Sequence, residues 1–394
     1  MTVPDERAAA RATVADHPPT NEELQKIWNR VVGRRAFLVQ AGLASAAATG
    51  AAAVAAPEAF GKAHVADVGP TAGDFAILRW LATAELIESD LWEQYAAFGG
   101  VNGANPAYIA ALQNLDGDMP QYISDNTDDE ETHAAFINAY LMSKGQAPVN
   151  LDKFRNLAPS PATGGGSTKR LTQLMDLNVD TSWYTRYRST TNPDLGATFA
   201  QAVRIEHEPG VPLNDTETPP GNSQPVPPVT PSQRRMQAIA NTAGFHFAMI
   251  EQGGSSLYTT MAQKVTSLEV LRIVVAIGGT EVNHFAIWHD KAGNAVSQPL
   301  AGVVDPKTGL KFPDFNALNS ELKQTNLIMP EPCEFIPGLP DCSIIRPSGV
   351  LHGGALAAFH ALATNNLFKG QPGSFFRLLK QTAAKADNAH RGVI

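Results

Sequence analysis

The chain has 394 residues, a formal net charge of −8, 43% hydrophobic residues and 17% charged residues. A chain of this length folds into one to three domains, and this composition is typical of a packed core. The acidic balance argues against a nucleic-acid partner, because such proteins carry a basic surface. Outside an Ala-rich N-terminal stretch, no apolar run reaches the roughly 20 residues of a membrane-spanning helix, so we expect no stable membrane span.

The first 66 residues have the features of an export signal. A polar stretch is followed by Arg34-Arg35 and then by a mildly apolar, Ala-rich run that ends near Ala56. This order of features resembles a twin-arginine signal peptide, a class that carries folded proteins across a membrane. An ordinary Ala-rich helix after a basic turn is the alternative. We therefore expect residues 1–66 to be a signal and leader, cleaved near residues 55–66, and the protein to be periplasmic or extracellular.

The two cysteines, Cys333 and Cys342, lie in one short segment with Pro-Gly and Pro-Asp turns. Such turns can bring the two sulfur atoms together. In an exported protein a disulfide is the favoured state of the pair, and two unpaired thiols are the alternative.

Four segments have the apolar spacing of amphipathic helices, which indicates an all-α fold. They cover residues 74–98, 121–143, 233–265 and 267–290. Residues 144–233 interrupt this pattern with a triple glycine and a proline-rich stretch, so we expect an irregular insertion between the second and third helices. Within it, residues 171–187 are predicted to form a short helix. Ser232 is expected to cap the third long helix.

Residues 294–394 are expected to form a partly helical C-terminal extension. Turn-forming residues dominate as far as Pro347, and two further helices are predicted near residues 350–366 and 373–386.

Each long helix carries a glutamate on the face that should be buried. These glutamates are Glu85, Glu130, Glu251 and Glu281. In the second and fourth helices a histidine follows three residues later, as Glu130-x-x-His133 and Glu281-x-x-His284. Residues three apart share a helix face, so each pair can bind one metal ion. A buried carboxylate is costly unless it is paired or bound to a cation, and this favours a metal site.

Other polar and aromatic residues give weaker signals. Glu88 lies on the same face as Glu85 and is either the true ligand of the first helix or a supporting residue. His246 is off the inward face of its helix, which favours a surface or supporting position. The triplet Glu206-His207-Glu208 sits in an irregular segment and is disfavoured as a metal site. Tyr258 and Trp288 lie near the ligands, where packing is favoured over electron transfer.

The order Glu, Glu-x-x-His, Glu, Glu-x-x-His along four helices is that of di-iron and di-manganese carboxylate bundles. On these motifs the chain resembles the ferritin-like superfamily, and within it the exported, desiccation-related branch, whose activity is poorly defined. The resemblance implies a ferritin-like four-helix bundle over residues 67–293, with residues 144–233 as its insertion. It also implies two Fe or Mn ions with bridging carboxylates. The implied terminal ligands are Glu130, His133, Glu281 and His284, with Glu85 and Glu251 completing the shell.

The resemblance further implies redox chemistry with dioxygen or peroxide, as a ferroxidase or a peroxide-handling enzyme. A non-catalytic envelope or stress protein that binds metal for stability or sequestration is the alternative. The insertion and the extension are larger than in minimal ferritins and argue against assembly into a cage. A smaller homo-oligomer stays open.

Overall fold

The computed structural model describes residues 69–180, 204–217, 226–292, 295, 299–312, 314, 338–342 and 353–392. The predicted export signal and Cys333 lie outside these residues, so the signal and the disulfide stay predictions. Cys342 is described and exposed.

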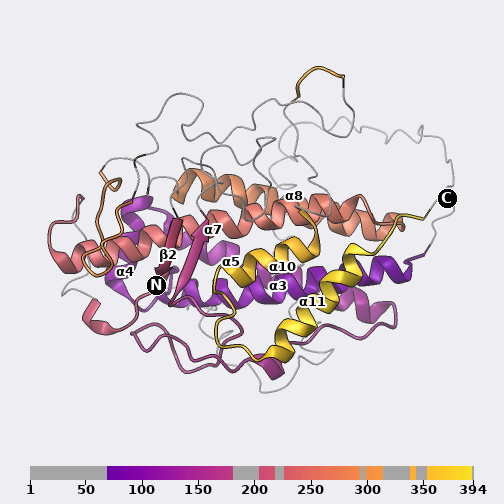
Figure 1. Cartoon of the computed structure of the whole chain (residues 1–394), viewed down its shortest axis with the longest axis horizontal. Helices are drawn as coiled ribbons and strands as arrows, with labels where there is room; N and C mark the ends of the chain where they lie inside the picture. The colour runs from indigo at the N-terminus through magenta and orange to yellow at the C-terminus, as the bar shows by residue number, and fades with distance from the viewer. Residues whose placement is uncertain are drawn as a thin grey trace, which may run out of the picture. The chain divides into compact units, whose positions relative to one another are not determined.

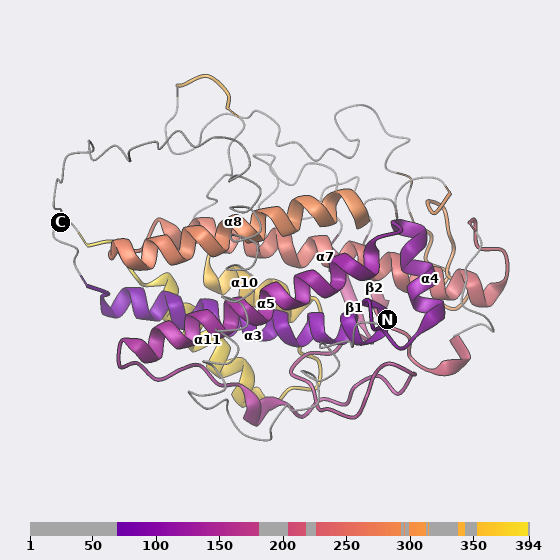
Figure 2. The ribbon, with the colours of Figure 1, turned by 180° about the vertical axis from the view of Figure 1, so that it is seen from behind.

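Four long helices form the bundle: α3 (Ala72–Gly99), α5 (Met119–Ser143), α7 (Pro231–Ala262) and α8 (Leu268–Lys291). In both views of the chain, α3 packs along α5 and α7 packs along α8 (Figures 1 and 2). The expected four helices are present, with ends within three residues of the predicted ones. The all-α class is confirmed.

The helix starts follow from local sequence. At α3 the Thr71 hydroxyl accepts a hydrogen bond from the Asp74 backbone N–H, and the Asp74 carboxylate accepts one from the Thr71 N–H. Thr230 and Gln233 form the same capping box at α7. The prediction that Ser232 caps α7 is wrong. Pro231 has no N–H to lose and a φ angle suited to a first helical turn, so the cap falls on the residue before it.

The connections add short elements to the bundle. They are α4 (Pro106–Leu115), the 3-10 turns η1 (Asp152–Phe154) and η2 (Asp215–Glu217), and the antiparallel strands β1 (Leu177–Asp180) and β2 (Arg204–Glu208). The predicted helix over residues 171–187 is wrong for its described part. Contacts far along the chain take the backbone groups that a helix would pair. The Asn178 N–H, which a helix would direct to Leu174, donates to the Asn365 carbonyl at 3.0 Å, and the Leu174 carbonyl accepts from the Gly210 N–H at 2.8 Å. Both groups are then unavailable to a helix.

The C-terminal extension packs on the bundle. Its helices α10 (Ala355–Thr364) and α11 (Gly373–Asp387) lie close to the predicted ranges, and α11 runs against α3 while α10 touches α7. They lie in front of the bundle in Figure 1 and behind it in Figure 2. Because α3 is covered by α5 on one side and by α11 on another, it is buried along most of its length.

Among the described helices, α8 is the one with the length and apolar composition of a membrane span. Its apolar side is packed along α7, and it places Glu281 and His284 inside the bundle. These features are those of a bundle core helix.

Candidate metal centre

Six ionisable side chains meet between the four bundle helices. They are Glu85 from α3, Glu130 and His133 from α5, Glu251 from α7, and Glu281 and His284 from α8. The four glutamates have no exposed surface, and the two histidines are 8% and 3% exposed. The structure therefore brings together all six residues that the sequence singled out as ligands.

The six side chains form two overlapping groups. One contains Glu85, Glu130, His133 and Glu281, and the other contains Glu130, Glu251, Glu281 and His284. In each group, one ligand atom per residue lies within 4.8 Å of the others. Glu130 and Glu281 belong to both groups, so their carboxylates lie between two positions that could each hold a cation. The resemblance had implied terminal positions for these two residues.

The histidine nitrogens face several carboxylates at once. His133 Nδ1 lies 3.3 Å from Glu85 Oε2, 3.2 Å from Glu130 Oε2 and 3.4 Å from Glu281 Oε1. His284 Nδ1 lies 3.0 Å from Glu130 Oε1 and 3.3 Å from Glu251 Oε2. A ring nitrogen can donate only one hydrogen bond. One hydrogen bond therefore cannot account for all of these short approaches. A cation placed between the nitrogen and the oxygens could bind them all at once.

Several of these buried atoms are left without a hydrogen bond. Among the described residues, no partner is found for Glu85 Oε2, Glu251 Oε2, both Glu281 oxygens and His284 Nδ1. A buried polar atom without a partner costs about 1–3 kcal/mol. Bound cations would satisfy all five atoms, so the residues present fit a metal centre.

A glycine on α7 makes room for the carboxylate of Glu281. A Cβ atom at Gly254 would lie 2.1 Å from Glu281 Oε2, which is closer than any contact allows. A larger residue here would therefore push the Glu281 carboxylate out of the position it holds in both ligand groups.

Electrostatics show how the site balances its charge without a metal. Burial raises the pKa of Glu281 well above its usual value, and the nearby charge of Glu130 adds to this. Burial likewise raises the pKa of Glu85 to about 7, against the opposing effect of His133. Burial would also raise the pKa of Glu130, but the facing imidazoles of His133 and His284 lower it.

Both imidazoles are held in the charged form by this environment. Burial acts to lower the pKa of His133 and of His284, but the facing charges of Glu85 and Glu251 outweigh it and raise both. In the metal-free site, bound protons therefore offset the negative charge of the carboxylates. Divalent cations would offset the same charge in the loaded site. Metal binding to such a site releases protons.

Further side chains orient the carboxylates. Tyr258 O–H donates to Glu85, and Trp92 Nε1–H donates to Glu251 Oε1 at 2.9 Å. The Asn126 amide donates to Glu130 Oε1 and to Glu251 Oε1, each at 3.0 Å. Partners of this kind fix the direction of metal ligands.

Asp129 supports His284 from the other side of the ring. Its Oδ2 lies 3.0 Å from His284 Nε2, although its side chain is 53% exposed. Sequence reasoning missed Asp129 and Asn126. Asn126 precedes Glu130 by four residues and shares its helix face, a signal that could have found it. Asp129 does not face inward on its own helix. Its contact with His284 forms only because α8 packs near α5, so no local pattern predicts it.

Glu88 is buried on the stripe of α3 that carries Glu85. Among the described residues, neither ligand group includes it. Burial first, and then the charges of Glu281 and Glu130, raise its pKa well above the usual value. Burial and the neighbouring carboxylates of the site therefore favour the protonated form of Glu88.

The remaining candidates take other places. His207 is exposed and lies 2.9 Å from Asp176, and Glu208 forms an ion pair with Arg235, so the triplet 206–208 does not converge on one point. His246 has no exposed surface, so the surface position considered for it is wrong.

The sequence model of a family described as a ferritin-like domain matches residues 73–294 of the chain. The chain belongs to the ferritin-like domain family. The match covers more than half of the 394 residues and includes all four bundle helices with both ligand groups. Comparisons with curated proteins and with solved structures gave no match. In this ferritin-like protein, the buried acidic and histidine groups are compatible with metal binding.

Proposed function

We propose that this ferritin-like protein holds two iron or manganese ions between its bundle helices and uses them in redox reactions with dioxygen or peroxide. One observation carries the proposal: two groups of three carboxylates and one imidazole share Glu130 and Glu281. Carboxylate and imidazole ligands suit iron and manganese, and shared carboxylates hold two ions close together.

The protein's own residues would hold and orient such a centre. Glu85 with His133 would hold one ion and Glu251 with His284 the other, and Glu130 and Glu281, which belong to both ligand groups, would contribute to each position. Iron or manganese would supply one-electron redox chemistry and a binding place for an oxygen species. The surrounding helices exclude bulk water from this point, because the glutamates have no exposed surface.

A protein that holds metal without turnover is the second candidate. The burial of the ligands favours it, since no ligand side chain is more than 10% exposed. The two candidates share the metal site and differ in the consumption of substrate. Assays of Fe(II) oxidation and of peroxide consumption by the loaded protein therefore separate them.

Metal content tests the site itself. We expect wild-type protein to hold two ions per chain, and Glu281→Ala and His133→Ala to hold far less, because each variant removes a ligand. Glu269→Ala is the matched control on α8: its side chain is 44% exposed and pairs with Lys144 at 2.9 Å, away from the centre. Elemental analysis of the purified proteins gives the ratio. Equal metal content in wild type and both ligand variants would refute the site.

We also propose that the protein is exported by the twin-arginine route, as in the desiccation-related branch that it resembles. Arg34-Arg35 before an Ala-rich run supports this proposal. Export of a folded chain fits a centre whose ligands come from four separate helices, since the centre can be loaded only after folding.

A further inference from the structure

The outward side of α11, in front of the bundle in Figure 1, carries charges of one sign. Four exposed cations follow one another along it: Arg377, Lys380, Lys385 and, just after the helix, Arg391. The acidic residue of this helix, Asp387, is buried. Residues 369–391 contain five lysines and arginines and one acidic residue, although the net charge of the chain is −8. We call the four exposed cations the basic face.

The positive charge of the basic face is not compensated within the described part of the chain. None of its four cations is found in an ion pair there. The oxygens of Asp387 accept hydrogen bonds from the N–H groups of Ala355 and Leu356 at the start of α10. Asp176 contacts Lys369, the fifth cation of this region. The acidic groups of this region are therefore engaged elsewhere, and the basic face meets solvent.

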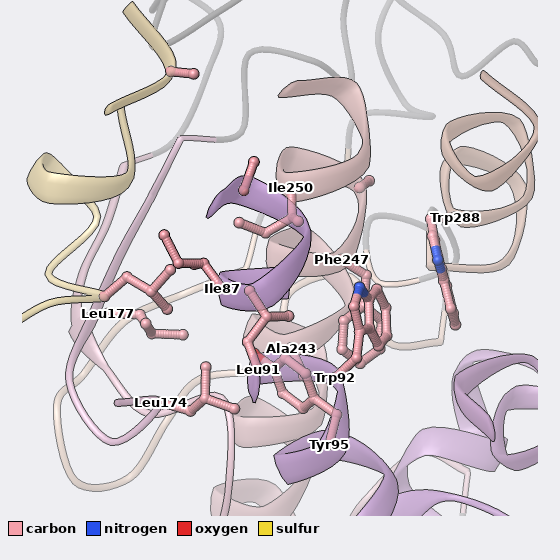
Figure 3. Close-up of a cluster of buried hydrophobic side chains, with 14 of the residues drawn as sticks. Ile87, Leu91, Trp92, Tyr95, Leu174, Leu177, Ala243, Phe247, Ile250 and Trp288 are labelled. Atoms are coloured by element: carbon pink, nitrogen blue, oxygen red, sulfur yellow. The ribbon is translucent and has the colours of Figure 1, made fainter. Parts of the chain in front are cut away.

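Packing of the protein core does not require the basic face. The opposite side of α11 holds the helix on the protein through Phe375 and Leu379, which have no exposed surface, and the helix packs on α3 and α10. The insertion covers another part of α3: Leu91 lies in one apolar cluster with Leu174 (Figure 3). Folding therefore explains the inward side of α11 and leaves the cations on its outward side unexplained.

The exposed side of α5 has the opposite charge. It carries Asp125, Asp128 and Glu131. Both α5 and α11 pack on α3, and in Figure 2 α5 lies in front of the bundle and α11 behind it. A negatively charged surface attracts the side with α11 and repels the side with α5. The distribution of charge thus favours one orientation of the protein toward such a surface.

Apolar side chains border the basic face. Phe376 and Leu378 precede and follow Arg377, so they lie about 100° to either side of it around the helix. Both are only partly buried. At a membrane surface, Lys and Arg side chains reach the headgroups while Phe and Leu contact the boundary of the acyl chains. A soluble polyanion offers no such apolar layer, so the two apolar borders favour a lipid surface.

We propose that the basic face of α11 docks this protein on the surface of a bilayer that contains anionic phospholipids. The helix lies along the membrane with its cations on the lipid phosphates and with Phe376 and Leu378 at the headgroup boundary. Each basic residue near such a surface strengthens binding about fivefold, so four of them give an attraction of several hundredfold. This inference goes beyond the proposed function and does not depend on a bound metal.

Co-sedimentation of the full chain with vesicles tests the proposal. We expect binding to vesicles made of equal parts of phosphatidylglycerol and phosphatidylcholine, and none to pure phosphatidylcholine. Salt at about 0.5 M, where the Debye length falls to about 4 Å, should release the protein. Arg377→Gln combined with Lys385→Gln should lower the partition coefficient about 25-fold, because two cations are lost.

Arg272→Gln combined with Lys311→Gln is the matched control. It removes one arginine and one lysine that are exposed outside α11, and the total charge changes by the same amount. The control should bind vesicles as wild type does. Circular dichroism checks that both double variants are folded.

Three results would overturn the inference. They are wild-type protein that does not bind the anionic vesicles, equal binding by the two double variants, and binding to soluble polyphosphate without binding to vesicles, which would assign the basic face to a polyanion. If the α11 variant does not fold, the salt titration of wild type decides, and vesicle binding that salt leaves unchanged would refute the proposal. Metal content is measured separately, so the proposed metal centre and the membrane surface can fail independently.

Discussion

Buried ionisable residues in this protein fall into two kinds. In the centre, charges of both signs face one another, and the facing groups decide the pKa values of His133 and His284. At His246 burial is the cause of the shift, and neutral partners surround the ring. Groups such as His133 and His284, which face opposite charges, could exchange bound protons for cations. His246 stays neutral in the folded chain, and this makes the fold less stable in acid.

His246→Gln should change how stability depends on pH. The imidazole has a pKa of about 3 in the folded chain and of 6.5 as its reference value. Between these values the unfolded chain binds a proton that the folded chain does not, so His246 costs stability as pH falls below 6.5. As pH falls below 6.5, the free energy of unfolding of wild type should therefore decrease relative to that of the variant, by about 1.4 kcal/mol per pH unit. Denaturant unfolding of the metal-free proteins between pH 4 and 8 measures it, and a difference that is constant over this range would contradict the prediction.

Close packing of α7 on α8 depends on two glycines. A Cβ atom at Gly278 would lie 2.8 Å from Tyr258 Cβ, and one at Gly254 would meet the Glu281 carboxylate. The two glycines therefore let α7 and α8 pack closely against each other. They also leave room for Glu251 of α7 and Glu281 of α8 in the candidate metal centre. Their positions explain why this helix pair can carry three of the six candidate ligands, Glu251, Glu281 and His284.

Gly254→Ala should separate metal binding from folding. The added methyl group displaces the Glu281 carboxylate, so we expect metal affinity to fall about 10–100-fold, as for residues that orient ligands. Alanine favours a helix over glycine by about 1 kcal/mol, which offsets part of the packing cost. Titration with Fe(II) and circular dichroism measure the two effects.

Gly279→Ala is the control for this variant. Gly279 lies on α8 two residues before Glu281, and a Cβ atom there meets nothing within 4 Å. Its metal affinity should match that of wild type. Equal affinity in Gly254→Ala would show that Glu281 does not need this space.

Across the whole molecule, buried polar contacts fasten the insertion and the extension to the bundle. Arg235 on α7 forms ion pairs with Glu208 and Glu217 of the insertion and with Asp305 of the C-terminal extension. Asp387 on α11 accepts hydrogen bonds from the N–H groups of Ala355 and Leu356 at the start of α10. A buried ion pair that loses one partner costs several kcal/mol, so these segments belong to the folded unit. Export after folding would carry all of them together with the centre.

Replacing both signal arginines tests export. Arg34→Lys combined with Arg35→Lys should leave the protein in the cytoplasm, because the twin-arginine route depends on this pair. Arg30→Lys, a nearby basic position in the same polar stretch, should be exported normally. Cell fractionation with immunodetection gives the distribution. Normal export of the double variant would rule out the twin-arginine interpretation.

The sequence by itself determined the bundle helices and the candidate ligand residues. A spacing of three places Glu130 with His133, and Glu281 with His284, on one face of any helix, whatever packs against it. The apolar stripes on the same faces then decide which way these residues point. Helix ends were predictable to within a few residues, although the cap of α7 is Thr230 and not Ser232, because Pro231 takes the first helical position.

The tertiary structure alone decided how these residues are shared and supported. The place of Glu130 and Glu281 in both ligand groups depends on the distance between helix pairs, which no local pattern contains. The same holds for the side-chain hydrogen bonds of His246 with Tyr95 and Asn365, since the three residues lie on helical segments more than 100 residues apart along the chain. Local spacing fixes only the direction of a side chain on its own helix. Hydrogen bonds and ion contacts between distant segments form only once burial has brought those helices together.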